Sequence, residues 1–197
     1  NDNQNNKQND NQNDENNQLV KFEKSLKVYE VFTDGSSINN GQKFKLQFGG
    51  IGIYFNRNEF GPICHPLTGK ITNNIAELKA CITAIEFLIK NKDFNDNHIY
   101  IYTDSEYTIN CILKWSKNWE KNGWKNSKKQ EVSNKELIIK LNNYYKKYKI
   151  KFIHVKAHQP EPKNKDSLEY KIWYGNFVAD KLAQTASYDS IKLQVLK

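Results

Sequence analysis

The chain has 197 residues, a length that fits one domain, and its 38% hydrophobic and 13% aromatic content is enough for a packed core. Its net charge of +8 favours phosphate-rich partners, and its three cysteines, without CxxC or Cys/His spacing, argue against a zinc site or disulfide framework. The cysteines indicate a reducing intracellular setting, either cytoplasm or nucleus, and the lack of a long apolar run argues against a membrane partner.

The N-terminal segment differs in composition from the rest of the chain. Residues 1–18 comprise nine Asn, four Gln, three Asp, one Glu and one Lys. Because such a segment has no apolar side chain to bury, nothing offsets the entropy lost on ordering. We therefore predict a disordered tail and lead-in over 1–26, a folded domain over 27–188 and a C-terminal tail over 189–197.

Three strands are predicted to come first. β-branched and aromatic residues alternate over Tyr29–Thr33, and further runs of this kind cover Gly49–Phe55 and Pro62–Leu67. Gly-rich turns between them favour an antiparallel meander. Asp34 ends the first run and precedes Gly35, so it is either the start of a turn or a functional carboxylate.

The hydrophobic period then becomes helical. Apolar residues recur at helical spacing from Ile75, and Thr72–Asn74 supplies capping side chains before it. Glu77 falls in the first turns, where a carboxylate is also favoured by the helix dipole. A strand follows over His98–Thr103, and Asp104 stands at its carboxyl end, a common place for an active-site residue or a simple helix cap.

The stretch Lys114–Lys135, here called the basic segment, is different in kind. It holds seven Lys, two Glu and three of the four Trp residues, and so carries +5 of the net charge of +8. Basic residues interleaved with aromatic ones suit a nucleic-acid backbone and its bases. The alternative is an amphipathic element whose Trp residues are core and whose Lys residues are solvated.

The remaining pattern predicts helices over Glu106–Lys114, Asn134–Tyr148 and Gly175–Ser187, and a fifth strand over Ile150–Val155. His158 follows that strand and opens a polar loop with two prolines, which we expect to be mobile. The order of elements predicts an α/β domain with a five-stranded mixed sheet, its first three strands antiparallel, flanked by helices.

Seven short motifs occur in one order along the chain: TDGS at 33–36, TNNIAELKA at 72–80, YTDSEYTINCI at 102–112, WEKNGWKNS at 119–127, NKEL at 134–137, HVKAH at 154–158 and GNFVADKLA at 175–183. On these motifs the chain resembles type 1 ribonuclease H, with its ribonuclease H-like fold, from about Lys27 to Tyr188. The resemblance implies an endonuclease that hydrolyses the RNA strand of RNA·DNA hybrids and leaves 5′-phosphate ends.

The resemblance also implies a metal-binding carboxylate set that consists of Asp34, Glu77, Asp104 and Asp180. Two hard cations about 4 Å apart can activate water, stabilise the leaving oxygen and screen the phosphate charge. Carboxylates without Cys or His suit two Mg²⁺ ions, with Mn²⁺ as a substitute, and not zinc.

The other site residues are also carried over from the resemblance. His158 would assist proton transfer or product departure, because an imidazole changes charge near neutral pH. Amides suit contact with the RNA 2′-hydroxyl, and the implied contacts are Asn40, Asn74 and Asn176. The implied contacts to the DNA strand are Thr72 and Asn134 at a phosphate and Tyr107, Trp115 and Ser127 along a channel. Asn73 is assigned to the nucleic-acid-binding set as well.

Two features depart from the family pattern. The Asn-rich segment stands where some members carry a hybrid-binding module, so we do not expect high processivity. His158 and Asp180 are 22 positions apart, more than is usual.

We expect a monomer. The alternatives are a DNA-cutting integrase or transposase of the same fold, a hybrid-binding module without catalysis, and a fragment of a reverse transcriptase.

Overall fold

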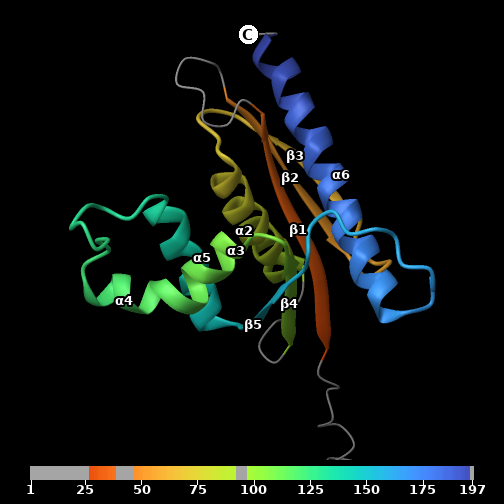
Figure 1. The fold of residues 1–197 in the computed structure, drawn as a ribbon, viewed down its shortest axis with the longest axis horizontal. Coiled ribbons are helices and arrows are strands. Elements are labelled where there is room, and N and C mark those ends of the chain that lie inside the picture. The colour runs from red at the N-terminus through yellow and green to blue at the C-terminus, as the bar shows by residue number, and fades with distance from the viewer. Residues whose placement is uncertain (1–26, 39–46, 92–96, 196–197) are drawn as a thin grey trace, which may run out of the picture.

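The computed structural model describes residues 27–38, 47–91 and 97–195 (Figure 1). The predicted tail over 1–26 and the candidate RNA contact Asn40 lie outside these residues. None of the described helices combines the length and the apolar character that a membrane crossing requires.

One five-stranded sheet forms the centre of the molecule, with the strand order β3-β2-β1-β4-β5. β1 pairs antiparallel with β2, and β2 with β3, whereas β1–β4 and β4–β5 are parallel pairs. This arrangement confirms the predicted mixed sheet with three antiparallel strands at its start. The strands are β1 (Val28–Ile38), β2 (Phe48–Phe55), β3 (Ile63–Leu67), β4 (His98–Thr103) and β5 (Lys149–His154).

Helices cover both faces of the sheet. α2 packs on one face and α6 on the other (Figure 1). α3 to α5 lie beside α2 in a lobe that projects from the sheet (Figure 1). The helical elements are α2 (Asn73–Asn91), α3 (Glu106–Asn110), the π-helical turn η1 (Cys111–Trp115), α4 (Ser116–Lys121), α5 (Lys135–Lys147) and α6 (Leu168–Val195).

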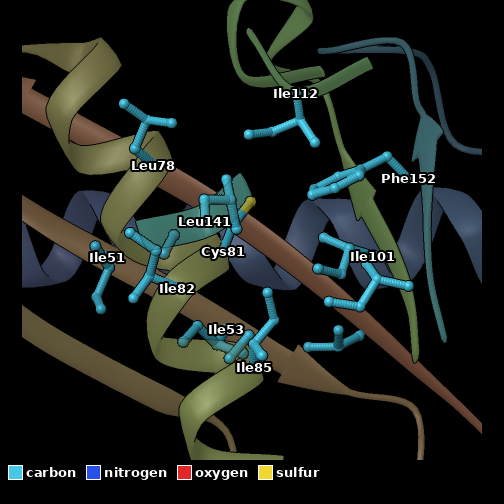
Figure 2. Close-up of a cluster of buried hydrophobic side chains, with 14 of the residues drawn as sticks. Ile51, Ile53, Leu78, Cys81, Ile82, Ile85, Ile101, Ile112, Leu141 and Phe152 are labelled. Carbon is cyan, nitrogen blue, oxygen red and sulfur yellow. The ribbon is translucent and has the colours of Figure 1, made fainter. Parts of the chain in front are cut away.

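The core is divided by the sheet into two parts. The larger part lies between α2 and the sheet, where Ile82 and Ile85 of α2 meet Ile53 of β2 and Ile101 of β4 (Figure 2). A smaller cluster on the α6 face joins Phe32, Tyr102, Val155 and Ala179. Because successive strand residues point to opposite faces, β1 places Val31 in the larger cluster and Phe32 in the smaller one.

α6 approaches the sheet closely because β2 carries glycines beneath it. A Cβ atom at Gly52 would collide with the backbone of Ala179 and Ala183 in α6. Close approach of a helix to a strand therefore depends on the missing side chain. This close contact determines how far Asp180, the neighbour of Ala179 in α6, lies from the sheet.

The structure corrects two predicted boundaries. β1 continues to Ile38, so Asp34 lies inside the strand and does not begin a turn, because Asp34 pairs with Gly52 and the ladder runs on. α6 begins at Leu168 and not at Gly175, so the predicted loop after His158 is shorter. The Ser167 hydroxyl accepts a hydrogen bond from the Tyr170 amide at 3.0 Å and caps the new start.

The same helix is also longer at its C-terminal end. It continues past Ser187 to Val195 and so takes in most of the segment assigned to a C-terminal tail, 189–197. Ser190 is fully buried, and its hydroxyl accepts a hydrogen bond from the Gly49 amide of β2 at 3.3 Å. Packing on β2 therefore extends the helix beyond its most apolar stretch.

Candidate functional site

The register of two parallel strands brings Asp34 and Asp104 to the same place. Phe32 of β1 is opposite Tyr102 of β4, and each aspartate follows two positions later. β4 ends at Thr103, so Asp104 leaves the sheet at its carboxyl end, beside the part of β1 that pairs only with β2. The two aspartates are close because each follows the last pair of the parallel β1–β4 ladder by two positions.

Glu77 reaches the same place from α2. A Cβ atom at Gly35 would collide with the backbone of Ala76 and Glu77, so the glycine permits the first turns of α2 to lie directly against β1. As a result, one carboxylate oxygen from each of Asp34, Glu77 and Asp104 lies within 4.8 Å of the others. We call these three residues the carboxylate cluster.

The cluster is electrostatically strained because its carboxylates share a buried space. Burial raises the pKa of Asp34 to about 7, and the charges of Asp104 and Asp180 add to the rise. Burial, followed by the charges of Asp34 and Asp104, raises the pKa of Glu77 well above its usual value. The Gly35 amide donates a hydrogen bond that opposes both shifts. A divalent cation would relieve this repulsion.

The cluster also fits a hard cation by its unused oxygen atoms. Among the described residues, the buried Oε2 of Glu77 has no hydrogen-bond partner. Buried carboxylate oxygens are normally paired or bound to a metal. An all-oxygen donor set suits Mg²⁺ or Mn²⁺ and not zinc.

Asp180 lies near the cluster without belonging to the group of oxygens within 4.8 Å. Its charge contributes to the raised pKa of both Asp34 and Asp104. The Gln184 amide, one turn later in α6, donates to Asp180 Oδ1 at 2.7 Å. The structure thus brings three of the four predicted carboxylates into one cluster and places the fourth at its margin.

Asn176 and His158 both face Asp104. Burial raises the pKa of Asp104, and the charge of Asp180 adds to the rise, whereas His158 and a hydrogen bond from the Asn176 side chain lower it. Asn176 is 8% exposed and lies one helical turn before Asp180. His158 is exposed and has a left-handed backbone, with φ of 50°.

A cavity of about 540 Å³ opens beside the cluster, and Asp104, His158, Asn176 and Asp180 all line it. β5, the segment after His158 and the start of α6 form its walls. The Trp173 indole N–H donates to the carbonyl oxygen of Gln159 at 2.9 Å, which fastens that segment to α6.

The residues predicted to contact the DNA strand are brought together in part. The Asn134 amide donates to the Tyr107 hydroxyl at 3.1 Å, although the two residues come from different elements. The ring of Trp115 meets that of Tyr107 edge-on, at 6.3 Å between centroids, and is 38% exposed. Ser127 is exposed in the turn of the basic segment, and no contact links it to this group among the described residues.

The basic segment combines features of both interpretations, a core element and a nucleic-acid-binding surface. Trp119 and Trp124 are partly buried against the core, as the structural alternative holds. Most lysines of the segment are exposed to solvent. Six are exposed and form no ion pair within the described part of the chain: Lys114, Lys117, Lys121, Lys125, Lys128 and Lys129.

Of the residues at the start of α2 that were predicted to bind nucleic acid, two also stabilise the fold. The Thr72 hydroxyl accepts a hydrogen bond from the Ile75 amide at 3.3 Å and caps the helix. Asn73 Oδ1 accepts from the amide and the hydroxyl of Ser37, at 2.9 and 2.7 Å, and ties the helix to β1. Asn74 is exposed beside them.

The sequence analysis missed one group of polar residues that positions α6. Glu30 of β1 accepts hydrogen bonds from Lys171 at 2.7 Å, Asn56 at 2.8 Å and Tyr102 at 3.1 Å. These contacts tie the first turn of α6 to the central strand. The signal that could have identified Glu30 is its charge, which is unusual inside a strand of apolar residues.

Comparisons with known proteins agree with this geometry. The family model described as RNase H matches residues 26–188. Human "Ribonuclease H1" is 35% identical over 160 residues, which are 81% of this chain and 50% of that protein. "Ribonuclease H" of Clostridium botulinum strain Hall is 38% identical over 135 residues, which are 68% of this chain and 86% of that protein.

A solved structure extends the comparison to three dimensions. The foamy viral protease-reverse transcriptase, solved in complex with an RNA/DNA hybrid, matches with a TM-score of 0.61 and 25% identity. The match covers 82% of this chain and 20% of that one. This chain therefore spans half of the human protein and a fifth of the viral one.

Proposed function

Because this chain belongs to the ribonuclease H family, we propose that it is an endonuclease that hydrolyses the RNA strand of RNA·DNA hybrids. The observation that carries the proposal is the carboxylate cluster, whose three members come from β1, α2 and the end of β4. Relatives named ribonuclease H and a viral neighbour solved with an RNA/DNA hybrid support it.

Asp34, Glu77, Asp104 and Asp180 would hold two divalent ions, Mg²⁺ in preference and Mn²⁺ as a substitute. When bound, such ions supply an activated water and neutralise the phosphate charge. The protein contributes by holding the carboxylates in place: Gly35 donates to Asp34 and Glu77, and Gln184 donates to Asp180. The burial of Asp34 and Glu77 keeps their charges poorly screened, which favours cation binding.

His158 would move a proton or ease product departure, since it lies beside Asp104 at the mouth of the cavity. The hybrid would be held on both sides of the cluster. Amides at the start of α2 suit the RNA 2′-hydroxyls, and Tyr107, Asn134 and Trp115 suit the DNA strand. The exposed lysines of the basic segment would bind phosphates.

A panel of four duplexes tests the proposal. RNA·DNA, RNA·RNA and DNA·DNA duplexes of one sequence, and a hybrid with a DNA strand labelled in place of the RNA, are incubated with the protein and Mg²⁺. We expect cuts only in the RNA of the hybrid, with 5′-phosphate ends. Asp104→Asn should abolish cutting and leave hybrid affinity within about threefold, because the change keeps the shape of the side chain.

Two outcomes of that panel would contradict the proposal. One is full activity of Asp104→Asn, and the other is equal cutting of the DNA·DNA duplex, which would favour the integrase alternative. Asp166→Asn, at an exposed carboxylate in the loop before α6, is the matched control and should cut like the unaltered protein.

We further propose a monomer in a reducing intracellular compartment. All three cysteines are free, and two of them, Cys81 and Cys111, are buried. Burial raises the pKa of the Cys81 thiol to about 12, which keeps it unreactive. Sedimentation of the purified protein tests the monomer.

A further inference from the structure

The cavity that Asp104 and Asp180 line is not confined to the carboxylates, because residues of β5 and α6 also form its walls. Part of its wall is apolar and aromatic, formed by Ile153 of β5, by Val155 just after that strand, and by Ile172, Trp173 and Phe177 of α6. Its volume of about 540 Å³ falls in the range of about 300–1,000 Å³ that is common for small-molecule sites.

One end of the cavity carries an unused hydrogen-bond acceptor. Asn176 is 8% exposed, and its Oδ1 atom has no partner among the described residues. The orientation of the amide is fixed, because the side chain donates its hydrogen bond to Asp104. A buried acceptor without a donor is costly, so a ligand that supplies an N–H group would be favoured at this place.

Apolar and aromatic side chains beside a buried hydrogen-bond acceptor match the chemistry of a nucleobase. A base has apolar faces that pack on aromatic side chains and an edge that carries N–H donors. Asp104 and Asp180 line the cavity and also lie at or beside the carboxylate cluster. The nucleotide whose phosphate lies at the cluster therefore has its base within reach of the cavity.

From these observations we propose that the cavity binds one unpaired base of the RNA strand next to the phosphodiester that is cut. The proposal rests on the proposed function and narrows its substrate class. Turning a paired base out of a duplex costs a few kcal/mol, whereas a bulged base is already unpaired. The protein should therefore prefer hybrids whose RNA strand carries a bulged nucleotide at the cut.

The segment after His158 helps to form the cavity that would hold the base. It lines the cavity with Pro160 and Pro162, and the Trp173–Gln159 hydrogen bond holds it against α6. The Lys171–Glu30 ion pair, at 2.7 Å, fixes the same helical turn to the sheet. Residues between His158 and Asp180 therefore form one wall of the cavity, opposite residues of β5 and those just after it.

The test compares four hybrids by fluorescence anisotropy in the Glu77→Gln background, which keeps the RNA intact. They are a fully paired hybrid, one with a single bulged adenosine in the RNA, one with an abasic bulge there, and one with the adenosine bulge in the DNA strand. We expect the RNA adenosine bulge to bind about fivefold or more tightly than the paired hybrid, as one base stacked on aromatic side chains would provide. The other two bulges should bind like the paired hybrid.

Two variants link the effect to the cavity. Ile172→Trp fills the cavity and should remove the gain, whereas Tyr188→Ala, at a 63% exposed position of the same helix, should keep it. Melting temperatures of both variants show whether each has folded. If Ile172→Trp does not fold, Trp173→Ala is measured in its place.

An equal gain from the abasic or the DNA bulge would overturn the proposal, because it would indicate a response to bending. A gain that survives the filled cavity would overturn it as well. Cutting of the fully paired hybrid is measured separately with the unaltered protein, and its absence would refute the proposed function without changing these binding results.

Discussion

The carboxylate cluster should make the metal-free protein less stable as the pH rises. A carboxyl whose pKa is higher in the folded than in the unfolded state binds a proton in the folded protein that the unfolded chain has already lost. For Asp34 this holds between its ordinary value of 3.8 and about 7. The free energy of unfolding therefore falls as the pH rises through this window, and the loss is complete above it.

Asp34→Asn removes this pH-dependent loss of stability, and the size of the loss follows from the pKa shift of Asp34. A shift of about three units corresponds to about 4 kcal/mol at 1.36 kcal/mol per unit. The new amide accepts the Gly35 hydrogen bond less strongly than a carboxylate does, so we expect a net gain of about 2–4 kcal/mol at pH 8. That gain is about 5–15 °C in melting temperature for a domain of this size.

The assay is thermal unfolding of both proteins in chelator between pH 4 and pH 8. The two melting temperatures should meet near pH 4 and diverge as the pH rises. Asp166→Asn, at an exposed carboxylate, should change neither curve. Added Mg²⁺ should stabilise the unaltered protein at pH 8 more than at pH 5, and should do little for Asp34→Asn.

Two results would refute this reasoning. If Asp34→Asn were destabilised equally at pH 4 and pH 8, the side chain would act through packing and not through its charge. If Mg²⁺ stabilised both proteins equally at pH 8, the cation would bind elsewhere.

Two further predictions concern the substrate side of the site. Alanine at four exposed lysines of the basic segment should weaken hybrid binding and lower the salt slope by about one for each lysine that contacts a phosphate, and an unchanged slope would make the segment purely structural. These lysines are Lys121, Lys125, Lys128 and Lys129, and the control set is Lys70, Lys90, Lys147 and Lys192. His158→Ala should slow turnover by about 10²–10⁴-fold and alter the pH profile of turnover, while Mg²⁺-dependent cutting persists. The control His65→Ala should have no effect. Loss of Mg²⁺ binding in His158→Ala would instead make His158 a metal ligand.

The sequence by itself determined the elements and the chemical character of the site. Alternation of apolar residues predicts β4 over the same residues, His98–Thr103, that the structure shows. The step from a period of two to a helical period marks the start of α2, where Glu77 lies. Such local patterns suffice because each element must bury one face, and the spacing of its apolar residues records that face.

Tertiary pairing decided where Asp34 lies and what surrounds it. An Asp-Gly pair favours a turn locally, yet Asp34 and Gly35 stay extended because β2 continues the ladder beside them. Gly35 then admits the backbone of α2 and so brings Glu77 to the cluster. No window of the sequence contains this information, because it depends on which strand and helix become neighbours.

The length of α6 was likewise decided by contacts far along the chain. Two prolines and several charges after His158 predict a loop, and before Gly175 the main local signal for a helix is the capping residue Ser167. The Lys171–Glu30 pair joins residues 141 positions apart and holds the first turn of α6 to β1, and the Trp173–Gln159 bond, 14 positions apart, joins the next turn to the segment after His158. The cavity beside the carboxylates exists only because those turns are helical and fixed, which packing alone could settle.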